Sequence, residues 1–382
     1  MLFKRKKRLA TMTLSILLSC SISYTMVSAA TVEKINKPIP KISSSGDNFS
    51  FLDEDGQAWL LGERKPTKIP GMNHVVDISH GGDIYTVKDD GSVWMYARDY
   101  EAENTWYFSI TKPIQLPVLK NITKVSTDNA YSAALDRDGR VWVWNSTKLG
   151  QPKLAFDAKI QAVPDLKKIV DIQVTVGTLI ALKEDGTVLQ GKYNYGMDWN
   201  ELQGAEVRFH QVPNLTHVAK LGTGQGRHHL VIKEDGTVWG WGPNGDGALT
   251  GSLDEGQETY STTLGYLGKQ VPEPIQIQGL SKIKEVSSGA YHNLALSEDG
   301  TVWQWGGIHI NIFQGFDKPV RPTPFQAISD VQTIWAAQDY SVAMKKDGTL
   351  WTWGKMRRWG ASLNFETGLH DGQLPVEVPY RS

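Results

Sequence analysis

A short apolar run, an Asp-Gly pair and an alternating aromatic run follow one another repeatedly along this chain. In the clearest copy, Leu230–Ile232 precedes Asp235-Gly236, and an aromatic run follows. Apolar residues recur at every second position, which predicts β-strands rather than helices. Asp-Gly between two strands predicts a hairpin with a type I′ turn, in which both central residues have positive φ. Trp239 and Trp241 are two positions apart, so we expect them on one face of a strand.

The Asp-Gly pair recurs at intervals of roughly 35 to 64 residues, close to the repeat length of propeller blades. The seven copies are Asp55-Gly56, Asp90-Gly91, Asp138-Gly139, Asp185-Gly186, Asp235-Gly236, Asp299-Gly300 and Asp347-Gly348. The third residue after each Gly is Trp59, Trp94, Trp142, Leu189, Trp239, Trp303 or Trp351. A second Trp follows two positions later as Trp144, Trp241, Trp305 and Trp353.

Further strand-like runs complete each unit. Upstream lies a run with a β-branched core, such as Ile122–Val125 or Ile283–Val286, with a weaker version at residues 39–42. Downstream of a variable loop lies a Pro-flanked run such as Pro113–Val118, which fits an outer strand because a missing N–H matters least there. Four strands per unit and seven units predict an all-β, seven-bladed β-propeller of four-stranded blades. The first and last units each contain a full set of strands.

The N-terminal segment predicts a signal peptide over residues 1–29. The basic stretch Lys4–Arg8 precedes a long apolar stretch, and Val27-Ser28-Ala29 has the small-residue spacing of a cleavage site. An uncleaved signal anchor and a lipoprotein modified at Cys20 are the alternatives. We therefore expect an N-terminal segment at 30–40, within which residues 31–38 could add a strand at the seam of the ring, and a propeller at 41–382. We also expect secretion or attachment at the cell surface.

The net charge and the single cysteine exclude several kinds of site and partner. Cys20 is the only cysteine, so the processed chain would lack disulfides and cysteine-bound metals. The formal charge is −1, and removal of the basic leader would leave about −6, which argues against nucleic acid or an anionic membrane as a partner.

The fifth and sixth units resemble repeats of the regulator of chromosome condensation family. That pattern has Gly, two residues, His, a short apolar strand, Asp-Gly, an aromatic strand and Trp-Gly, as in Gly289, His292, Asp299-Gly300 and Trp305-Gly306. The fifth unit supplies His228, Asp235-Gly236, Trp241-Gly242 and the turn residues 244–247. In the other units the family His is replaced by Asn48, Asp83, Tyr131, Thr178 and Tyr340.

The resemblance covers about residues 40–382 and implies a propeller that binds other proteins. The founding member of the family acts on a small GTPase and on chromatin. Exported bacterial propellers with this repeat are a closer analogue, and one of them inhibits β-lactamases by protein–protein contact. The resemblance therefore implies a protein-binding or inhibitor-like scaffold.

The sequence lacks the common motifs of catalytic and metal-binding sites. Nine His residues form no His-Glu-x-x-His motif, and we interpret His228 and His292 as structural hydrogen-bonding residues. The run Gly222–Gly226 lacks the third glycine of a dinucleotide fingerprint. The Asp residues before Gly are typical of turns rather than of calcium loops. We therefore predict no catalysis, no metal and no cofactor.

The aromatic residues fall into two groups. Ten Trp residues lie at fixed register on the third strands, where we expect them to pack between blades. Other aromatic and Arg residues lie in the variable loops, which strand alternation places on one face of the disc, opposite the Asp-Gly hairpins. The candidate binding residues on this long-loop face are Tyr100, Trp106, Tyr107, Tyr193, Tyr195, Trp199, Tyr260, Tyr266, Arg358 and Trp359. The alternative is that these side chains only hold their own loops.

The sequence thus predicts a monomeric propeller that binds an extracellular or cell-surface protein. An extracellular enzyme or binder acting on cell-wall polysaccharide is the alternative, since a propeller can carry acids near its axis. Candidate acids are Asp198, Glu201, Glu206, Asp254, Glu255 and Glu258. A surface-attached structural module is a third interpretation.

Overall fold

The computed structural model of the chain describes most of the predicted propeller. The described residues are 40–45, 48–61, 66–96, 113–128, 130–146, 160–192, 208–224, 226–244, 247–251, 257–261, 266–290, 292–307, 320–338, 340–354, 357–358, 361–362 and 375–378. The chain divides into the units Met1–Asn36 and Lys37–Ser382, and all described residues belong to the second unit. The predicted signal peptide and the extra strand at 31–38 lie outside the described residues.

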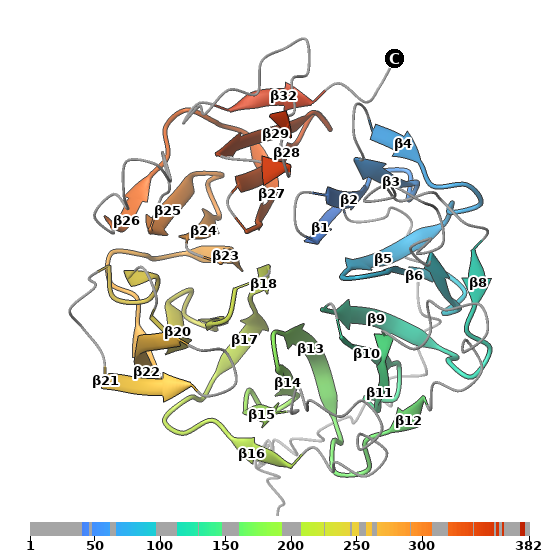
Figure 1. Ribbon diagram of the computed structural model, residues 1–382, viewed down its shortest axis with the longest axis horizontal. Coiled ribbons are helices and arrows are strands. Elements are labelled where there is room, and N and C mark those ends of the chain that lie inside the picture. The colour runs from blue at the N-terminus through green and yellow to red at the C-terminus, as the bar shows by residue number, and fades with distance from the viewer. Residues whose placement is uncertain are drawn as a thin grey trace, which may run out of the picture. The chain divides into compact units, whose positions relative to one another are not determined.

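Seven antiparallel blades surround a central axis, in chain order around the ring (Figure 1). The first four blades are β1 (Lys41–Ser45) to β4 (Pro66–Lys68), β5 (Val75–His80) to β8 (Ile114–Gln115), β9 (Ile122–Thr127) to β12 (Gln161–Ala162), and β13 (Ile169–Thr175) to β16 (Phe209–Gln211). Their middle strands are β2 (Asn48–Leu52), β3 (Ala58–Leu61), β6 (Ile84–Lys88), β7 (Val93–Tyr96), β10 (Tyr131–Asp136), β11 (Val141–Asn145), β14 (Thr178–Lys183) and β15 (Val188–Lys192). The predicted four-stranded blades are confirmed here.

The last three blades carry additions to this plan. Blade five contains β17 (Val218–Leu221), β19 (His229–Lys233), β20 (Val238–Pro243) and β22 (Tyr266–Gln276), with β21 (Gln257–Ser261) outside β22. Blade six contains β23 (Ile283–Ser288), β24 (His292–Ser297), β25 (Val302–Gly306) and β26 (Val320–Pro324), and β18 (Thr223–Gly224) pairs with β23. Blade seven contains β27 (Val331–Ala336), β28 (Tyr340–Lys345), β29 (Leu350–Gly354) and β32 (Val376–Val378). The short strands β30 (Arg357–Arg358) and β31 (Ala361–Ser362) pair with each other.

The Asp-Gly hairpins form as predicted, but the predicted turn type is wrong. In blade five the Gly236 N–H donates to the Lys233 carbonyl at 2.9 Å, and the Lys233 N–H donates to the Thr237 carbonyl at 2.9 Å. Gly236 has a φ of 75°, whereas Asp235 is not among the described residues with positive φ. This is a three-residue loop, a type I turn followed by a left-handed Gly. It spares Asp the left-handed conformation, and the Asp235 carboxylate instead accepts the Thr237 N–H at 2.9 Å.

Five of the hairpins, those of blades one to five, also bind the start of the next blade. The carbonyl of Gly236 accepts the N–H of Ile283, the first residue of β23, at 3.1 Å. A Cβ on Gly236 would lie 3.0 Å from the Cα of Lys282, so the pair needs glycine for close approach as well as for its turn. The residue before the inner strand has positive φ in blades two to seven: His74, Asn121, Lys168, His217, Lys282 and Asp330. In these five blades the Asp-Gly pair therefore serves docking between blades as well as the turn.

The hydrophobic core is a set of layers between neighbouring blades. One such layer joins Ile180 and Leu182 of blade four to Val231 and Trp241 of blade five, with Trp239 packed against it. Both Trp residues thus lie on one face of β20, as predicted, and the predicted packing of these rings between blades is confirmed. Burial of an aromatic side chain of this size stabilises the fold by roughly 2–3 kcal/mol.

The seam between blades seven and one closes the ring through side chains. The indole N–H of Trp335 on β27 donates to Ser44 Oγ on β1 at 2.7 Å, and the rings of Phe49 and Tyr340 lie 6.3 Å apart. Twelve buried residues from the two blades form this layer. Among the described strands, blade one and blade seven are each built from their own part of the chain, as predicted, and exchange no strand.

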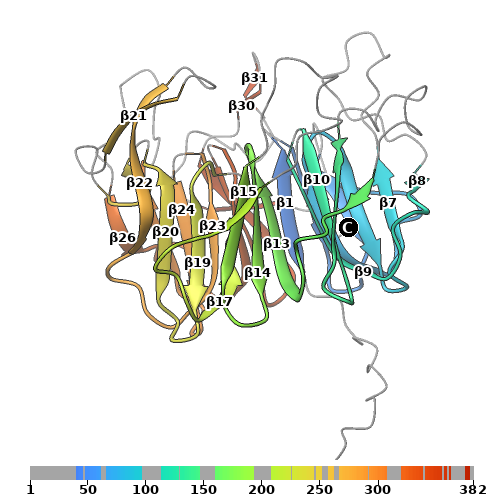
Figure 2. The same ribbon diagram turned by 90° about the horizontal axis from the view of Figure 1, so that it is seen from below.

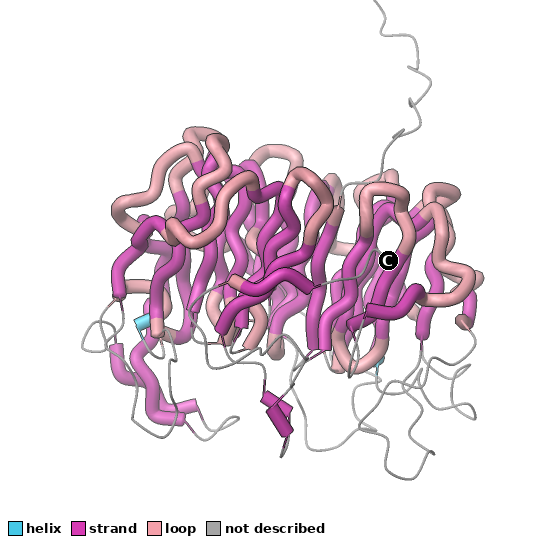
Figure 3. The backbone as a smooth tube through the Cα atoms, turned by 90° about the horizontal axis from the view of Figure 1, so that it is seen from above, coloured by secondary structure: helices cyan, strands magenta, loops and turns pink. Residues whose placement is uncertain are grey.

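The two faces of the ring differ. The strands β21, β30 and β31 project from the face at which the inner strands end, which we call the long-loop face (Figure 2). Described loops cover the opposite face (Figure 3), and strand alternation places the Asp-Gly hairpins there, because each joins the second strand of a blade to the third. The predicted separation of hairpins and insertions onto opposite faces is therefore confirmed for the described strands.

Candidate functional site

The inner strands surround the axis, and each has one edge without a neighbouring strand in its own blade. The N–H groups on such an edge need other partners. Serines of the preceding blade supply them: Ser43 Oγ accepts the His80 N–H at 2.8 Å, Ser79 Oγ accepts the Thr127 N–H at 3.0 Å, and Ser126 Oγ accepts the Val174 N–H at 2.8 Å. Ser287 Oγ accepts the Ala336 N–H in the same way at 2.8 Å. These hydroxyls link successive blades around the axis.

Charged side chains alternate in sign two residues before these serines. The third residue of the inner-strand run is Lys41, Asp77, Lys124, Asp171, Lys220 and Glu285 in blades one to six. Lys41 forms an ion pair with Asp77, and Lys124 forms one with Asp171. The acids also accept backbone N–H groups of the following blade, for example Val125 N–H at Asp77 Oδ2 at 2.7 Å. Each acid is thus held between two blades.

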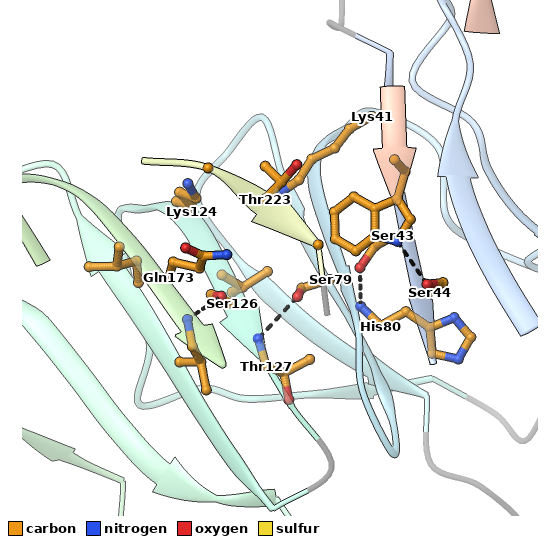
Figure 4. Close-up of a pocket in the computed structure, with 16 residues that line it drawn as sticks. Lys41, Ser43, Ser44, Ser79, His80, Lys124, Ser126, Thr127, Gln173 and Thr223 are labelled. Carbon is orange, nitrogen blue, oxygen red and sulfur yellow. Dashed lines mark hydrogen bonds between the residues drawn. The ribbon is translucent and has the colours of Figure 1, made fainter. Parts of the chain in front are cut away.

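A pocket lies beside the axis, between the inner strands of the blades. We call it the axial pocket, and its volume is about 430 Å³ including the part open to solvent. Its lining contains Lys41, Ser43, Ser44, Ser79, His80, Lys124, Val125, Ser126, Thr127, Ile172, Gln173, Val174, Gly222, Thr223, Gly224 and Trp335. In the close-up the two lysines lie at one end, and the serines that bind backbone N–H groups lie beside them (Figure 4).

A change of strand partner opens one side of this pocket. After β17 the chain leaves blade five, and β18 pairs in parallel with β23 of blade six. A Cβ on Gly224 would lie 2.2 Å from the Ser288 carbonyl oxygen, and Gly224 has a φ of 102°. The run Gly222–Gly226, predicted not to be a dinucleotide fingerprint, therefore serves close backbone packing. The pocket extends between β13 of blade four and the displaced β18.

The two family-type histidines form hydrogen bonds between blades, which confirms the structural interpretation. His228 Nε2 lies 2.5 Å from Asn293 Oδ1, and His292 Nε2 lies 2.9 Å from Ser341 Oγ. Burial lowers the pKa of His228 to about 4, so its ring is neutral at pH 7. Among the described residues no group of three or more His, Cys, Asp or Glu side chains could hold a metal ion.

Glu285 has an unusual environment at the seam between blades six and seven. Its Oε1 accepts the Thr333 hydroxyl at 2.7 Å and the Ile334 N–H at 3.2 Å. Burial raises the pKa of Glu285 to about 7, although these two hydrogen bonds favour the charged form. The carboxyl therefore titrates near neutral pH.

The raised pKa of Glu285 predicts that the free energy of unfolding depends on pH. The pKa of Glu285 in the folded state exceeds the usual value of 4.5. Proton binding therefore stabilises the fold fully below pH 4.5, and this stabilisation is lost as the pH rises through about 7. We expect the stability of the wild type relative to Glu285→Gln to fall by roughly 2 kcal/mol between pH 4.5 and 8, less than the full shift because the carboxyl is partly exposed. Urea unfolding across this range measures it. Parallel pH profiles for the two proteins would contradict the assignment.

The predicted binding residues of the long-loop face are placed only in part. Tyr100, Trp106, Tyr107, Tyr193, Tyr195, Trp199 and Trp359 lie outside the described residues. Tyr260 lies on β21, Tyr266 on β22 and Arg358 on β30, the strands that project from that face. Their role in binding stays a prediction.

Sequence reasoning missed the axial pocket. The β-branched residues of the runs Ile122–Val125 and Ile283–Val286 predict strands, whereas the charges at the third positions, Lys124 and Glu285, indicate the charged groups around the axis. An alignment of the inner runs on their first apolar residue shows Lys and acid alternating from blade to blade.

The chain is thus a seven-bladed propeller of four-stranded blades, in which Asp-Gly hairpins contact the start of the next blade. Residues 235–296 match the family model described as the regulator of chromosome condensation (RCC1) repeat. The chain thus carries the RCC1 repeat, and the resemblance predicted from its motifs is confirmed.

Relatives of known identity show the same likeness. Protein RCC1 of Candida albicans is 28% identical over 209 residues, covering 50% of this chain and 42% of that protein. The mitochondrial RCC1 domain-containing protein RUG3 of Arabidopsis thaliana is 25% identical over 301 residues, covering 69% of this chain and 62% of that protein. The matched region is therefore less than two thirds of either relative.

A solved structure supports the fold. The yeast RCC1 (Prp20), solved with Kap60 bound, superposes with a TM-score of 0.61 at 18% identity, covering 83% of this chain and 78% of that chain.

Proposed function

We propose that this protein is an exported scaffold that binds another protein through its long-loop face and has no catalysis of its own. The observation that carries this proposal is the one-sided placement of the described insertions, since β21, β30 and β31 all project from the same face. The yeast RCC1 propeller has been solved with another protein bound, which supports the general mode of action.

The insertion of blade five supplies a rigid part of that face. β22 has 11 residues, and its first part, Tyr266–Gln270, pairs with β21. Its last part pairs with β20, where Ile275 and Gln276 lie opposite Gly240 and Trp239. The projecting hairpin thus continues the blade sheet instead of hanging from it. A preordered element loses less conformational entropy on binding, which favours affinity.

The proposed partner is an extracellular or cell-surface protein. The basic and apolar stretches of residues 1–29 support export, and the remainder of the chain contains no cysteine that would depend on a reducing compartment. Among the described residues, no helix is long and apolar enough to span a membrane. We propose that the processed protein acts as a monomer.

The test is capture of a partner followed by substitution on the two faces. Protein lacking residues 1–29 is immobilised, the extracellular fraction is passed over it, and a retained protein is identified by mass and titrated as purified material. Replacing Trp106, Trp199 and Trp359 together with Ala should weaken binding at least 100-fold, because aromatic anchors dominate interface energies.

A matched control lies on the opposite face. Replacement of the exposed hairpin residues Arg137, Glu234 and Glu298 with Ala should leave the affinity within about twofold of wild type, because these side chains lie on the face opposite the proposed binding surface. If the hairpin variant loses binding and the tryptophan variant keeps it, the long-loop face is not the binding surface.

The polysaccharide alternative gains no support from the described residues. Its acids Asp198, Glu201, Glu206, Asp254 and Glu255 lie outside them, and Glu258 lies on β21. It stays a prediction from the sequence.

A further inference from the structure

The lining of the axial pocket is cationic although the charges around the axis nearly balance. Lys41 and Lys124 both line it, whereas no Asp or Glu does. Their partners Asp77 and Asp171 point into the seams between blades. There the acids accept backbone N–H groups of the next blade, Val125 at Asp77 Oδ2 and Leu221 at Asp171 Oδ2. Each carboxylate is thus shared between its lysine and the backbone, and of the two charged groups only the lysine lines the pocket.

Exposure of the side chains shows the same asymmetry. The side chain of Lys41 is 24% exposed and that of Asp77 is 9% exposed, while Lys124 is 27% exposed and Asp171 is 18% exposed. An ion approaching along the pocket meets the ammonium groups first. Burial lowers the pKa of Lys41 in spite of Asp77, whereas the pKa of Lys124 is raised because Asp171 and Asp77 outweigh its burial.

Three serine hydroxyls add hydrogen-bond donors to the same pocket. The oxygens of Ser43, Ser79 and Ser126 each accept a backbone N–H of the next blade. This contact uses a lone pair and leaves the hydroxyl proton for a second partner. Within the described part of the chain, none of the three donates to another side chain or to a carbonyl. The pocket thus presents two ammonium groups and three hydroxyl donors from blades one, two and three.

We propose that the axial pocket binds a small oxyanion, such as a phosphate, a sulfate or a carboxylate group. Several charge-assisted hydrogen bonds at one place are the usual recognition of such a group, because each oxygen carries lone pairs for more than one donor. Lys41 and Lys124 supply the charge, and Ser43, Ser79 and Ser126 supply the neutral donors. Trp335 and the backbone of β18 close the remaining walls.

This site is independent of the long-loop face. Its residues belong to the inner strands and to β18, which all lie within the ring. Loss of partner binding in the tryptophan variant would leave the oxyanion site intact, and loss of the oxyanion site would leave the proposed partner surface in place.

The test is a titration of the purified protein with sodium phosphate, sodium sulfate and sodium acetate at pH 7. Sodium chloride keeps the ionic strength constant, since screening alone changes protein electrostatics. We expect saturable heat with one site per chain by calorimetry, and a melting temperature that rises with the anion concentration. A preference for phosphate or sulfate identifies a tetrahedral oxyanion as the ligand, and an equal or stronger response to acetate identifies a carboxylate.

Two pocket variants and one control make the test specific. Lys124→Gln with Asp171→Asn removes a whole ion pair, so no lone buried charge remains, and should weaken binding at least tenfold. Gln173→Glu keeps every ion pair but adds a negative charge to the lining, and should also weaken binding at least tenfold. Lys183→Gln with Asp185→Asn removes an exposed pair on a blade-four hairpin and should bind like wild type.

The proposal is overturned if none of the three anions gives a saturable signal at constant ionic strength. It is also overturned if both pocket variants fold, as judged by their melting without anion, and bind as tightly as the control. If one variant fails to fold, the other decides the outcome.

Discussion

Replacing Gly224 with Ala should destabilise the folded protein by more than about 4 kcal/mol, the largest effect we expect from a single methyl group. The new Cβ would lie 2.2 Å from the Ser288 carbonyl oxygen and 2.7 Å from the Ser288 nitrogen. Both atoms belong to the backbone of β23, which cannot move without breaking its pairing with β24. The φ of 102° adds strain for any residue with a side chain.

Gly279→Ala is the matched control for this substitution. Gly279 also has positive φ, 87°, but a Cβ there would meet no atom within 4 Å. Its cost should be about 1 kcal/mol, the strain of a left-handed backbone alone. Urea unfolding of both variants separates the clash from the strain. Equal stability of the two variants would show that β18 does not pair with β23 in solution.

Trp335→Ala should destabilise the protein by about 3–5 kcal/mol, in the range of a large-to-small substitution in a packed core. Trp335 is 7% exposed, and its indole N–H donates to Ser44 Oγ at 2.7 Å across the closing seam. The substitution leaves a cavity in the layer that joins the first blade to the last, which also contains Ile42 and Tyr340. Both packing and the hydrogen bond between the ends of the ring are lost.

Trp335→Phe separates these two contributions. Phe keeps an aromatic ring in the layer but lacks the indole N–H, so the loss should be nearer 1–2 kcal/mol. Urea unfolding followed by circular dichroism provides the free energies and the slope of the transition. A loss below about 1 kcal/mol for Trp335→Ala would show that the seam contributes little to closure.

The fold was predictable because the residues that repeat are those that every blade needs. Trp241 and Val238 fill the layers on either side of blade five, and Gly236 docks against the start of blade six. The turn type was not predictable from Asp-Gly alone. The pair suits both a two-residue and a three-residue loop, and the choice depends on register, here Lys233 opposite Thr237.

The axial pocket was hidden because it combines residues far apart in the sequence. Lys41, Ser79 and Ser126 come from three blades, and none forms a local motif with its neighbours. The displaced β18 was signalled by the glycines of 222–226, whose spacing indicates close backbone approach but not which strand approaches. The loops of the long-loop face follow no common pattern, so the repeat offers no template for their conformations.

Closure of the ring by side chains has a consequence for the order of folding. Serine contacts between successive inner strands join residues 37 to 49 positions apart, whereas Trp335 and Ser44 are 291 positions apart. Closing the longer loop costs roughly 1.6 kcal/mol more chain entropy, so the last seam gains from blades that are already assembled. We therefore expect the ring to assemble as a linear repeat array does, in which each unit adds to its neighbour. A chain whose closing seam is broken should persist as an open arc of stacked blades, larger in hydrodynamic radius than the ring but rich in β-structure.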